Sequence, residues 1–464
     1  MKRFFILSIL NKHNMSNMPH EAKEGSEDEI RQLLVLSKSL PSASLDLATI
    51  TKLDLFQVGL SSLPSSLPQY LPNLSILFCM KNKFEEVPAV IGKCPKLQMV
   101  SFKSNQIKEI HPEALQPQMR WLILTDNKIT CLPSTIGRCT KLQKFMLSGN
   151  LIETLPQEIS SCHNLELIRL ASNRLAQPPM ELLSLPKLSW VALSDNPFLS
   201  SAFQNETIHL EVFEDESLDD ASLGTELGKG ASGICRRYKT VPSDKNKNAE
   251  EVAVKEYFST ITSDGNPQEE RKVSMVASSL GCSSLVTVLG RTKNGNLIME
   301  LLKNYTVFGN PPSLESCSRD VYDEDMCASF SERRAFALVE HLLYALMNLH
   351  DQGICHGDFY GHNILISNED EDRVWLTDFG AAFFYDRDSA YGKAIERVER
   401  RAFGHLVNEI GSLLTSSSSS ATATMNIGRD TKSVQGKLFQ LASCCDDLTF
   451  KQLHRNWEEM KIVE

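Results

Sequence analysis

Four residues in the second half of the chain carry side chains suited to handling phosphate and a divalent cation. Lys255 lies near the end of the alternating stretch EVAVKEYF, Asp358 and Asn363 stand five residues apart, and Asp378 opens a D-F-G triplet. A lysine ammonium neutralises phosphate oxygens, and carboxylate and carbonyl oxygens are the hard ligands that Mg²⁺ prefers. Phosphoryl transfer depends on such positioning and charge neutralisation more than on covalent chemistry. The residue types therefore indicate phosphate chemistry.

A glycine-rich segment upstream points to the same chemistry. LGKGASGIC places Gly228, Gly230 and Gly233 in G-x-G-x-x-G spacing, with Gly233 22 residues before Lys255. Glycines let a backbone approach phosphates where side chains would collide. Alone, such a triad also serves dinucleotide sites or plain turns. A dinucleotide site would have a helix directly after the glycines, whereas here a strand continues through CRRYK. This order favours a loop that folds over phosphates.

The elements that must position these residues follow in a fixed order. NLIMELL has the pattern of a buried strand, and RRAFALVEHLLYALMNLHDQG has apolar residues at helical spacing. ICHGDFYGHNILI and VWLTDFGAA come next. A glycine loop, a strand lysine, a helix, H-x-D-x-x-x-x-N and D-F-G in this order resemble the protein kinase family, over roughly residues 221–464.

The resemblance implies a role for each catalytic candidate. Lys255 would neutralise the α- and β-phosphates of ATP while pairing with a helix glutamate, either Glu270 or its neighbour Glu269. Asp358 would accept or orient the proton of the substrate hydroxyl. Asn363 would complete the catalytic set.

The same resemblance implies the nucleotide and metal contacts. Asn363 and Asp378 would hold Mg²⁺. Met299, Glu300 and Leu302 match the adenine hinge, and Leu365 matches the apolar floor beneath the base. The full set expected to contact ATP is Leu227, Gly228, Gly230, Gly233, Cys235, Ala253, Lys255, Glu270, Met299, Glu300, Leu302 and Leu365.

The catalytic loop departs from the family pattern at two positions. H-R-D reads His356–Gly357–Asp358, so the arginine that meets an activation-loop phosphate is missing. Two residues after the aspartate, Tyr360 replaces the usual lysine, for which His362 is a partial substitute. HGDFYGHN resembles a divergent group of leucine-rich repeat kinases. These departures leave open a pseudokinase scaffold and, since some small-molecule kinases also use H-G-D, a small-molecule kinase.

The region after D-F-G is also short. No A-P-E follows, Glu396 being the nearest candidate, and D-x-W-x-x-G is replaced by a segment that begins at Glu399. Three hydroxyl residues (Tyr385, Ser389 and Tyr391) lie between Asp378 and Glu396. We expect activity not to depend on their phosphorylation, because Gly357 offers no cation. The low-complexity stretch 415–424 predicts a flexible loop.

The first half of the chain is repetitive. Asparagines recur every 22 or 23 residues, each closing the frame L-x-x-L-x-L-x-x-N, at Asn82, Asn105, Asn127, Asn150, Asn173 and Asn196. This pattern resembles the leucine-rich repeat of the short cytosolic type, over about residues 50–198. Alternate leucines would share a core between units, and each asparagine would satisfy backbone groups at the following turn. Outward strand residues would form an apolar row: Ile76, Phe78, Met80, Met99, Trp121, Ile123, Met146, Leu167 and Trp190. We expect this row to bind a protein partner, through Trp121, Ile123, Met146 and Trp190.

Composition limits the other possibilities. The net charge of −10 argues against a nucleic-acid partner. The twelve cysteines form no zinc-finger pattern, which is typical of reduced thiols in a cytoplasmic protein. No apolar run reaches the roughly 18 residues of a membrane span. The opening MKRFFILSIL lacks a cleavage site, so we expect no secretory signal.

Together these patterns predict a multidomain α/β and α+β protein, a leucine-rich repeat solenoid followed by a bilobal protein kinase fold. The function expected is ATP-dependent phosphorylation of protein hydroxyls, Ser/Thr rather than Tyr, with the repeats recruiting a partner or substrate. The expected parts are a partly disordered extension (1–49), the repeats (50–198), an acidic linker (199–220) and the kinase domain (221–464).

Overall fold

The computed structural model describes residues 27–36, 46–199, 212–213, 218, 225–230, 233–240, 251–258, 261–262, 264–417 and 433–462. The chain divides into two compact units. The first comprises Met1–Leu188 with Asn196–Phe198, and the second comprises Ser189–Asp195 with Leu199–Glu464. The residues between the two parts of the first unit, which carry the last repeat strand, thus belong to the second unit.

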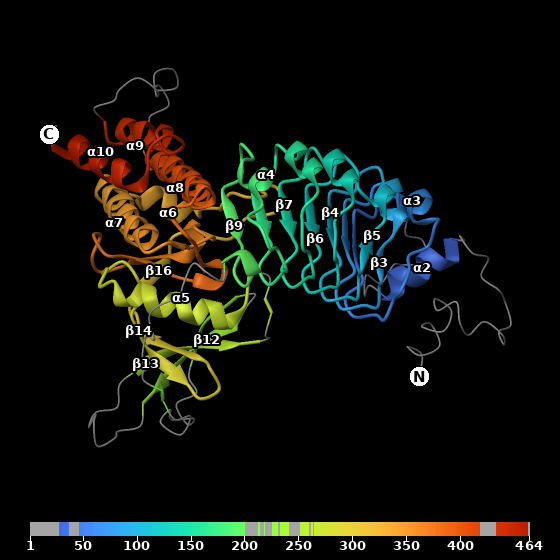
Figure 1. Ribbon diagram of the computed structural model, residues 1–464, viewed down its shortest axis with the longest axis horizontal. Helices are drawn as coiled ribbons and strands as arrows, with labels where there is room; N and C mark the ends of the chain where they lie inside the picture. The colour runs from blue at the N-terminus through green and yellow to red at the C-terminus, as the bar shows by residue number, and fades with distance from the viewer. Residues whose placement is uncertain are drawn as a thin grey trace. The chain divides into compact units, whose positions relative to one another are not determined.

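Short parallel strands, one for each repeat, form the framework of the repeat region (Figure 1). Their sheet has the order β1-β2-β4-β6-β7-β8-β9. The strands are β1 (Lys52–Asp54), β2 (Ile76–Phe78), β4 (Met99–Ser101), β6 (Trp121–Ile123), β7 (Lys144–Met146), β8 (Leu167–Arg169) and β9 (Trp190–Ala192). Strands β3 (Glu86–Val87) and β5 (Glu109–Ile110), which follow β2 and β4 in the sequence, form a separate two-stranded parallel sheet.

The core of the first unit comes from the central residue of each strand. These central residues pair in register and are fully buried: Leu53, Leu77, Val100, Leu122, Phe145 and Ile168. A three-residue strand cannot bury its apolar side chain alone, so each repeat depends on its neighbours for its core. The 3₁₀ turns η2 (Ala89–Lys93), η4 (Ser134–Arg138) and η5 (Gln157–Ser161) each lead into a buried cysteine.

The asparagines join consecutive repeats. The amide oxygen of Asn150 accepts a hydrogen bond from the backbone N–H of Ile129 at 3.0 Å. Its amide nitrogen donates to the carbonyl of Leu124 at 3.0 Å and to that of Leu147 at 2.8 Å. Two of the three partners lie in the preceding repeat, not at the following turn as the sequence suggested. The asparagine therefore satisfies backbone groups that the short strands leave without a partner.

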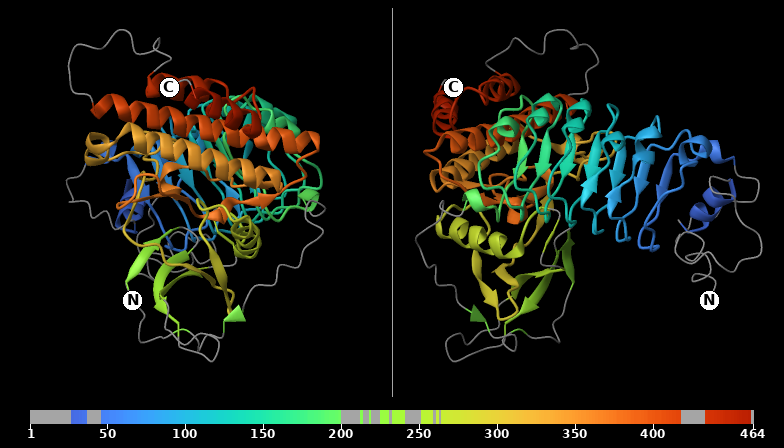
Figure 2. Two further views of the ribbon diagram at one scale, coloured as in Figure 1. Left: turned by 90° about the vertical axis from the view of Figure 1, so that its left-hand side faces the viewer. Right: turned by 45° about the vertical axis from the view of Figure 1, so that its right-hand side comes forward.

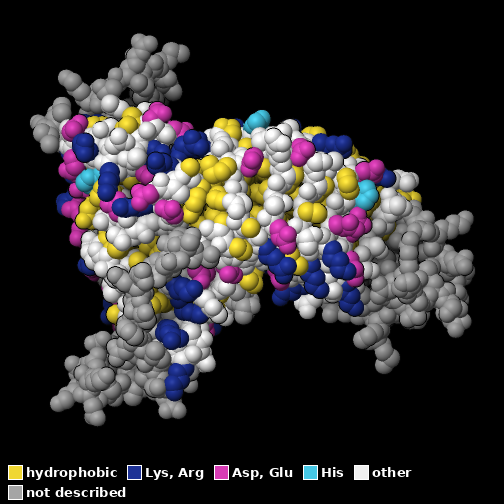
Figure 3. Space-filling view, in the orientation of Figure 1, with side chains coloured by type: hydrophobic (Ala, Val, Ile, Leu, Met, Phe, Trp, Pro, Cys, Tyr) yellow, Lys and Arg dark blue, Asp and Glu magenta, His cyan; other side chains and the backbone are white. Residues whose placement is uncertain are grey.

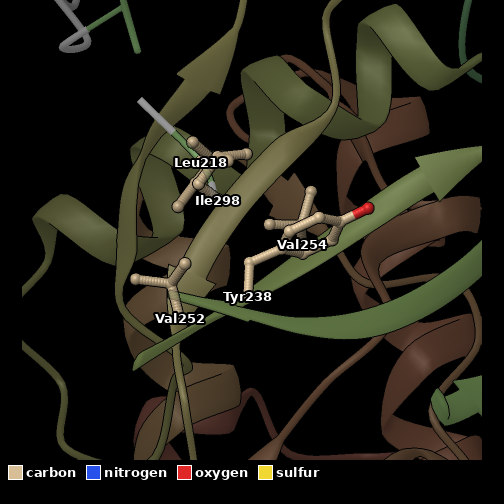
Figure 4. Packing of buried hydrophobic residues seen from close by; sticks show 5 residues of the cluster. All are labelled: Leu218, Tyr238, Val252, Val254 and Ile298. Atoms are coloured by element: carbon tan, nitrogen blue, oxygen red, sulfur yellow. The ribbon is translucent and has the colours of Figure 1, made fainter. Parts of the chain in front are cut away.

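The second unit begins with a six-stranded sheet of order β10-β14-β15-β13-β12-β11. These strands are β10 (Val212–Phe213), β14 (Val288–Thr292), β15 (Leu297–Glu300), β13 (Glu251–Tyr257), β12 (Gly233–Lys239) and β11 (Glu226–Lys229). Tyr238, Val252, Val254 and Ile298 pack on one face with Leu218 (Figure 4). Both β10 and Leu218 come from the segment expected to be an acidic linker. Leu199 ends the 3₁₀ turn η6 (Pro197–Leu199), and the rest of that segment lies outside the described residues.

Helices make up most of the remaining chain. Helix α5 (Pro267–Ser279) begins at Asn266, whose side chain caps the Gln268 N–H at 2.8 Å. Helices α6 (Glu324–Ser329), α7 (Glu332–Asp351), α8 (Ala390–Ser417), α9 (Val434–Ser443) and α10 (Phe450–Ile462) follow. The long helices α7 and α8 lie side by side (Figure 2). Lys and Arg interleave with Asp and Glu over these helices, so the face in view carries no single sign of charge (Figure 3).

Small sheets connect these helices. Strands β16 (Tyr305–Val307), β18 (Ile364–Ser367) and β19 (Val374–Leu376) form one, and β17 (Ile354–Cys355) pairs with β20 (Phe383–Phe384). The predicted long helix is confirmed as α7. Helix α8 extends through Ser417, so the first residues of the expected 415–424 loop are helical, and the rest lie outside the described residues. Within the expected N-terminal extension, the described parts are helix α2 (Glu27–Leu36) and residues 46–49, which include the 3₁₀ turn η1 (Leu47–Thr49).

The asparagine bonds predict a measurable dependence of stability on Asn150. Asn150→Ala would leave the buried Ile129 N–H without its acceptor, at a cost on the order of 2 kcal/mol. The Leu124 and Leu147 carbonyls would each lose one donor and keep those of Asn127 and Asn173. Denaturant unfolding followed by circular dichroism would show this as an earlier first transition.

The matched control is Asn164→Ala, which removes an exposed bond to the Thr140 carbonyl. A surface change of this kind costs about 0.5 kcal/mol or less. Equal loss of stability in the two variants would contradict the interpretation.

Candidate active site

Strand β13 places Lys255 on the sheet face opposite the apolar cluster. Val252 and Val254 point into that cluster, and alternation along the strand turns Ala253 and Lys255 to the other face. Ala253 pairs with Met299 across β15, and Lys255 pairs with Cys235 across β12. Residues from three strands therefore meet on one face.

Lys255 is held between two carboxylates. Its Nζ lies 2.6 Å from Glu270 Oε1 on α5 and 2.8 Å from Asp378 Oδ1. Glu270, not Glu269, makes the contact, because Glu269 pairs with Lys272 on its own helix. Lys255 and Glu270 are buried. A lone charge would be costly in such a position, so each charge depends on its partners.

The electrostatics keep this group ionised. Burial lowers the pKa of Lys255, but the negative charges of Asp378 and Glu270 outweigh it and raise that pKa well above its usual value. Burial raises the pKa of Asp378, but the Lys255 charge and hydrogen bond lower it to about 2. One ammonium faces two carboxylates, so one negative charge is in excess. The arrangement suits a further cation beside Asp378.

Buried Glu399 of α8 anchors the catalytic loop. Its carboxylate accepts hydrogen bonds from the backbone N–H groups of His356 at 2.9 Å and Gly357 at 2.6 Å. It also pairs with His350 Nε2 of α7 at 2.7 Å. Burial raises the pKa of Glu399, but the His350 contact and the other donors bring it below its usual value. A charged carboxylate thus fixes the turn that precedes Asp358.

Asp358 and Asn363 contact each other directly. The Asn363 side-chain nitrogen donates to the Asp358 carbonyl at 2.8 Å and to its Oδ2 at 3.0 Å. The Asn363 carbonyl accepts from the N–H and hydroxyl of Thr377, both at 2.9 Å. Thr377 precedes Asp378, so the loop and the D-F-G segment are linked. His356 adds a second link, from its Nε2 to the Thr377 carbonyl at 3.0 Å.

The glycine loop divides into open and crowded positions. A Cβ on Gly228 or Gly230 would meet no atom within 4 Å, whereas one on Gly233 would lie 2.3 Å from the Glu256 carbonyl oxygen. The first two glycines therefore leave space that a bound phosphate would use. Gly233 is required by the approach of strand β13.

The other expected ATP contacts lie on strands β11, β12, β15 and β18 or directly after β15. Leu227 is half-buried on β11, and Cys235 lies on β12, where burial raises the pKa of its thiol to about 11. Glu300 ends β15, and its carboxylate accepts from the Thr287 N–H at 2.8 Å. Leu302 follows that strand, and half-buried Leu365 lies on β18.

The structure accounts for the glycine in the catalytic loop and shows what His362 contacts. Gly357 has a φ of +73°, and a Cβ there would lie 2.5 Å from the Val191 carbonyl and 2.8 Å from that of Ala381. An arginine at this position is sterically excluded. His362, the expected partial substitute for the lysine, directs its Nδ1 to Asp320 at 2.8 Å, and the charges of Asp358 and Asp378 also favour its protonated form. Burial lowers the pKa of His362, but the Asp320 contact raises it above its usual value.

Tyr385, one of the three hydroxyl residues between Asp378 and Glu396, is buried, with its Oη 2.6 Å from His350 Nδ1. One sequence expectation needs correction. Trp190, expected on an exposed partner surface, is 2% exposed. Periodicity marked it only as an outward strand position. Met99 and Leu167 of the same row are buried as well. The remaining residues of the row are half-buried: Ile76, Phe78, Met80, Trp121, Ile123 and Met146.

Comparisons with known proteins match two parts of the chain to known families. Residues 222–400 match the family described as protein kinase domain, and residues 117–175 match leucine rich repeat. The chain combines a leucine-rich repeat with a protein kinase domain. Such a domain implies ATP and a divalent metal in general.

Three curated kinases show detectable similarity. Death-associated protein kinase dapk-1 of Caenorhabditis elegans is 22% identical over 185 residues, 39% of this chain and 12% of its own length. MAP3K epsilon protein kinase 1 of Arabidopsis thaliana is 28% identical over 167 residues, which are 34% of this chain and 11% of that protein. Calcium-dependent protein kinase 27 of Arabidopsis thaliana is 25% identical over 177 residues, which are 36% of this chain and 33% of that protein. The chain spans a third or less of each relative.

Two further observations bear on the site and its setting. Within the described ranges, no helix is both long and apolar enough to cross a membrane. In the same ranges, no group of three or more His, Cys, Asp and Glu side chains is arranged to hold a metal. A kinase-type Mg²⁺ instead takes one or two carboxylates together with phosphate oxygens of the nucleotide. Asp378 and Asn363 fit that requirement.

The glycine geometry predicts opposite effects for two alanine variants. Gly230→Ala should leave the melting temperature of the free protein unchanged, because its Cβ enters open space. It should reduce the rise in melting temperature on adding Mg·ADP, since the methyl group would crowd the phosphates.

Gly233→Ala should lower the melting temperature of the free protein by several degrees, because its Cβ clashes with the backbone of β13. Thermal scans with and without Mg·ADP check both variants. A destabilised Gly230→Ala protein, or an unaffected Gly233→Ala protein, would contradict the assignment of the loop.

Proposed function

We propose that this chain is an active ATP-dependent protein kinase that phosphorylates protein hydroxyls, on Ser or Thr rather than Tyr. One observation carries the proposal: Lys255 contacts both Glu270 and Asp378. This contact requires helix α5, strand β13 and the D-F-G segment to be assembled together. The named kinases among the relatives support the same activity.

In this proposal Lys255 neutralises the α- and β-phosphates and is itself oriented by Glu270. Gly228 and Gly230 let the backbone of the loop approach the phosphates. Asp358 accepts or orients the proton of the acceptor hydroxyl, and its carboxylate is held by the Asn363 side chain. Met299, Glu300, Leu302 and Leu365 surround the adenine together with Leu227, Cys235 and Ala253.

Mg²⁺ is the divalent ion that best fits the donors present. Asp378 and Asn363 supply a hard carboxylate and an amide oxygen, the ligand types that Mg²⁺ takes up with nucleotide phosphates. The excess negative charge around Lys255 favours a cation there. The ion would neutralise charge on the phosphates, while the protein residues orient them.

The alternative is a pseudokinase scaffold, motivated by Tyr360 at the usual lysine position and by the short region after D-F-G. The four groups for phosphoryl transfer (Lys255, Asp358, Asn363 and Asp378) are all present, and the contacts among them favour activity. A small-molecule kinase is less favoured, because a protein-binding repeat accompanies the catalytic unit.

The repeats have a separate role in the proposal. We infer that residues 50–198 form one continuous solenoid that recruits a partner or substrate protein, and that 221–464 is the kinase domain. The strand residues Trp121, Ile123 and Met146 offer half-buried apolar surface, and the Lys144 ammonium lies 4.6 Å from the Trp121 ring centroid. Apolar and aromatic surfaces of this kind typically mark protein interaction sites.

A cytoplasmic location completes the proposal. Its support is chemical: all twelve cysteines are free thiols, and eight of them are buried. Free thiols of this number are typical of a reducing compartment.

Lys255→Met and Asp378→Asn should each lower phosphate transfer from radiolabelled ATP to general protein substrates by about 100-fold or more. Each removes a charge that positions or neutralises the phosphates. Asp358→Asn should do the same by removing the proton acceptor.

Lys272→Met is the matched control, because Lys272 is exposed on α5 and pairs with Glu269 of the same helix. It should retain wild-type transfer. Wild-type turnover in Lys255→Met or Asp378→Asn would refute the kinase assignment. No transfer by the wild type, with Mg·ATP still bound, would establish the pseudokinase.

The partner proposal predicts that Trp121→Ala combined with Ile123→Ala weakens capture of a protein bound by the wild type. Aromatic anchors typically cost about 2 kcal/mol or more when truncated in an interface, which is roughly a 30-fold loss of affinity. Co-purification followed by measurement of the dissociation constant checks this. His163→Ala, an exposed change on a repeat loop, should have no effect. Undiminished binding by the double variant would exclude this surface.

A further inference from the structure

Strand β9 packs within the catalytic unit although its sequence belongs to the last repeat. Leu188, Val191 and Leu193 continue the leucine frame that Asn196 closes. The residues Ser189–Asp195 nevertheless belong to the same compact unit as the two lobes. All three residues of β9 are buried. This strand is therefore a candidate for a role in the catalytic site.

Trp190 of β9 contacts the catalytic loop in two ways. Its indole Nε1–H donates a hydrogen bond to the Phe359 carbonyl at 2.9 Å. Its ring stacks on Tyr360, with centroids 4.3 Å apart and planes inclined by 6°. Phe359 and Tyr360 directly follow Asp358, so Trp190 restrains the backbone immediately after the expected proton acceptor.

Other residues hold the Trp190 ring in place. His405 of α8 stacks against it with centroids 5.4 Å apart, and the Arg319 guanidinium lies 5.1 Å from its centroid. His405 Nε2 also lies 3.1 Å from the Ser189 hydroxyl and 3.2 Å from Arg319. Contacts on several sides leave the indole little rotational freedom, so it can act as a fixed support.

The backbone of β9 also accounts for the missing arginine. A Cβ on Gly357 would lie only 2.5 Å from the Val191 carbonyl oxygen, so this position admits no larger residue. Strand β9 thus contacts the loop before Asp358 through Val191 and after it through Trp190. Tyr360 in turn stacks on His362 at 4.9 Å, next to Asn363, which bonds the Asp358 carboxylate.

We propose that Trp190 is a positioning residue for phosphotransfer: its stack on Tyr360 and its hydrogen bond to the Phe359 carbonyl hold the catalytic loop so that Asp358 faces the acceptor hydroxyl. Tyr360 occupies the position of the usual lysine, and the Trp190 stack gives it a structural role there. The inference rests on the proposed kinase function. It makes the last repeat strand a part of the catalytic site.

The test uses the full-length chain with Trp190→Ala and Trp190→Phe. Trp190→Ala should lower kcat tenfold or more and leave the KM for ATP within about twofold, because Trp190 contacts the catalytic loop after Asp358 and not the Lys255 group. Trp190→Phe retains an aromatic ring for Tyr360 and loses only the Nε1 donor. It should recover part of the lost kcat.

Tyr344→Ala is the control, an aromatic on α7 that is 45% exposed. It should keep both constants. A Trp190→Ala protein with wild-type kcat would overturn the proposal, as would a raised KM for ATP with kcat unchanged. If Trp190→Ala fails to fold, Trp190→Phe is measured instead. A wild-type kcat in Trp190→Phe would show that the Nε1 hydrogen bond does not position the loop.

A second readout does not depend on activity. Hydrogen exchange of the backbone amides from Asp358 to Asn363 should accelerate in Trp190→Ala, and in Trp190→Phe to a smaller extent, with the rest of the chain unchanged. If the wild type transfers no phosphate, the proposed function fails, and the exchange data still decide whether Trp190 orders the loop. Unchanged exchange in this segment would overturn the positioning role.

Discussion

The buried ammonium of Lys255 is the constraint on which the catalytic arrangement depends. A single buried charge is destabilising, and its desolvation is offset only when partners with good geometry surround it. Here the partners come from α5 and from the D-F-G segment, at 2.6 and 2.8 Å. The charge therefore draws a helix and a loop to the same face of the sheet. The apolar cluster on the opposite face fixes the strand that carries it.

Glu399 solves the corresponding problem for the catalytic loop. The backbone N–H groups of such a loop have no partners within a helix or a sheet, so they need other acceptors when they are buried. The carboxylate of Glu399 accepts two of them and pairs with His350, which also contacts the Tyr385 hydroxyl. One buried carboxylate thus couples α7, α8 and the loop. The strand β9 then supports the same loop from another direction, through Trp190.

Much of this could be predicted from the sequence, because the functional motifs are local. The spacing of Lys255, Asp358, Asn363 and Asp378 indicated a kinase, and the repeating asparagines indicated stacked repeat strands. The bonding partners of Asn150 were less predictable, since two of them belong to the preceding repeat. Trp190 illustrates the limit. It has the same outward position in its repeat as Trp121, but it bonds to Phe359, 169 residues away. Periodicity cannot reveal a contact over that separation. The nearest signal was Gly357, whose type indicated a backbone that something approaches closely.

The central claim is that Lys255 and Asp378 form a site for a nucleotide with its divalent cation. Calorimetric titration of the full-length protein with a non-hydrolysable ATP analogue, with and without Mg²⁺, tests it most directly. The excess carboxylate charge beside Lys255 repels bare phosphates, so Mg²⁺ should tighten binding at least tenfold, about 1.4 kcal/mol. The account predicts that this gain disappears in Asp378→Asn. The same affinity with and without Mg²⁺ in the wild-type protein would contradict it.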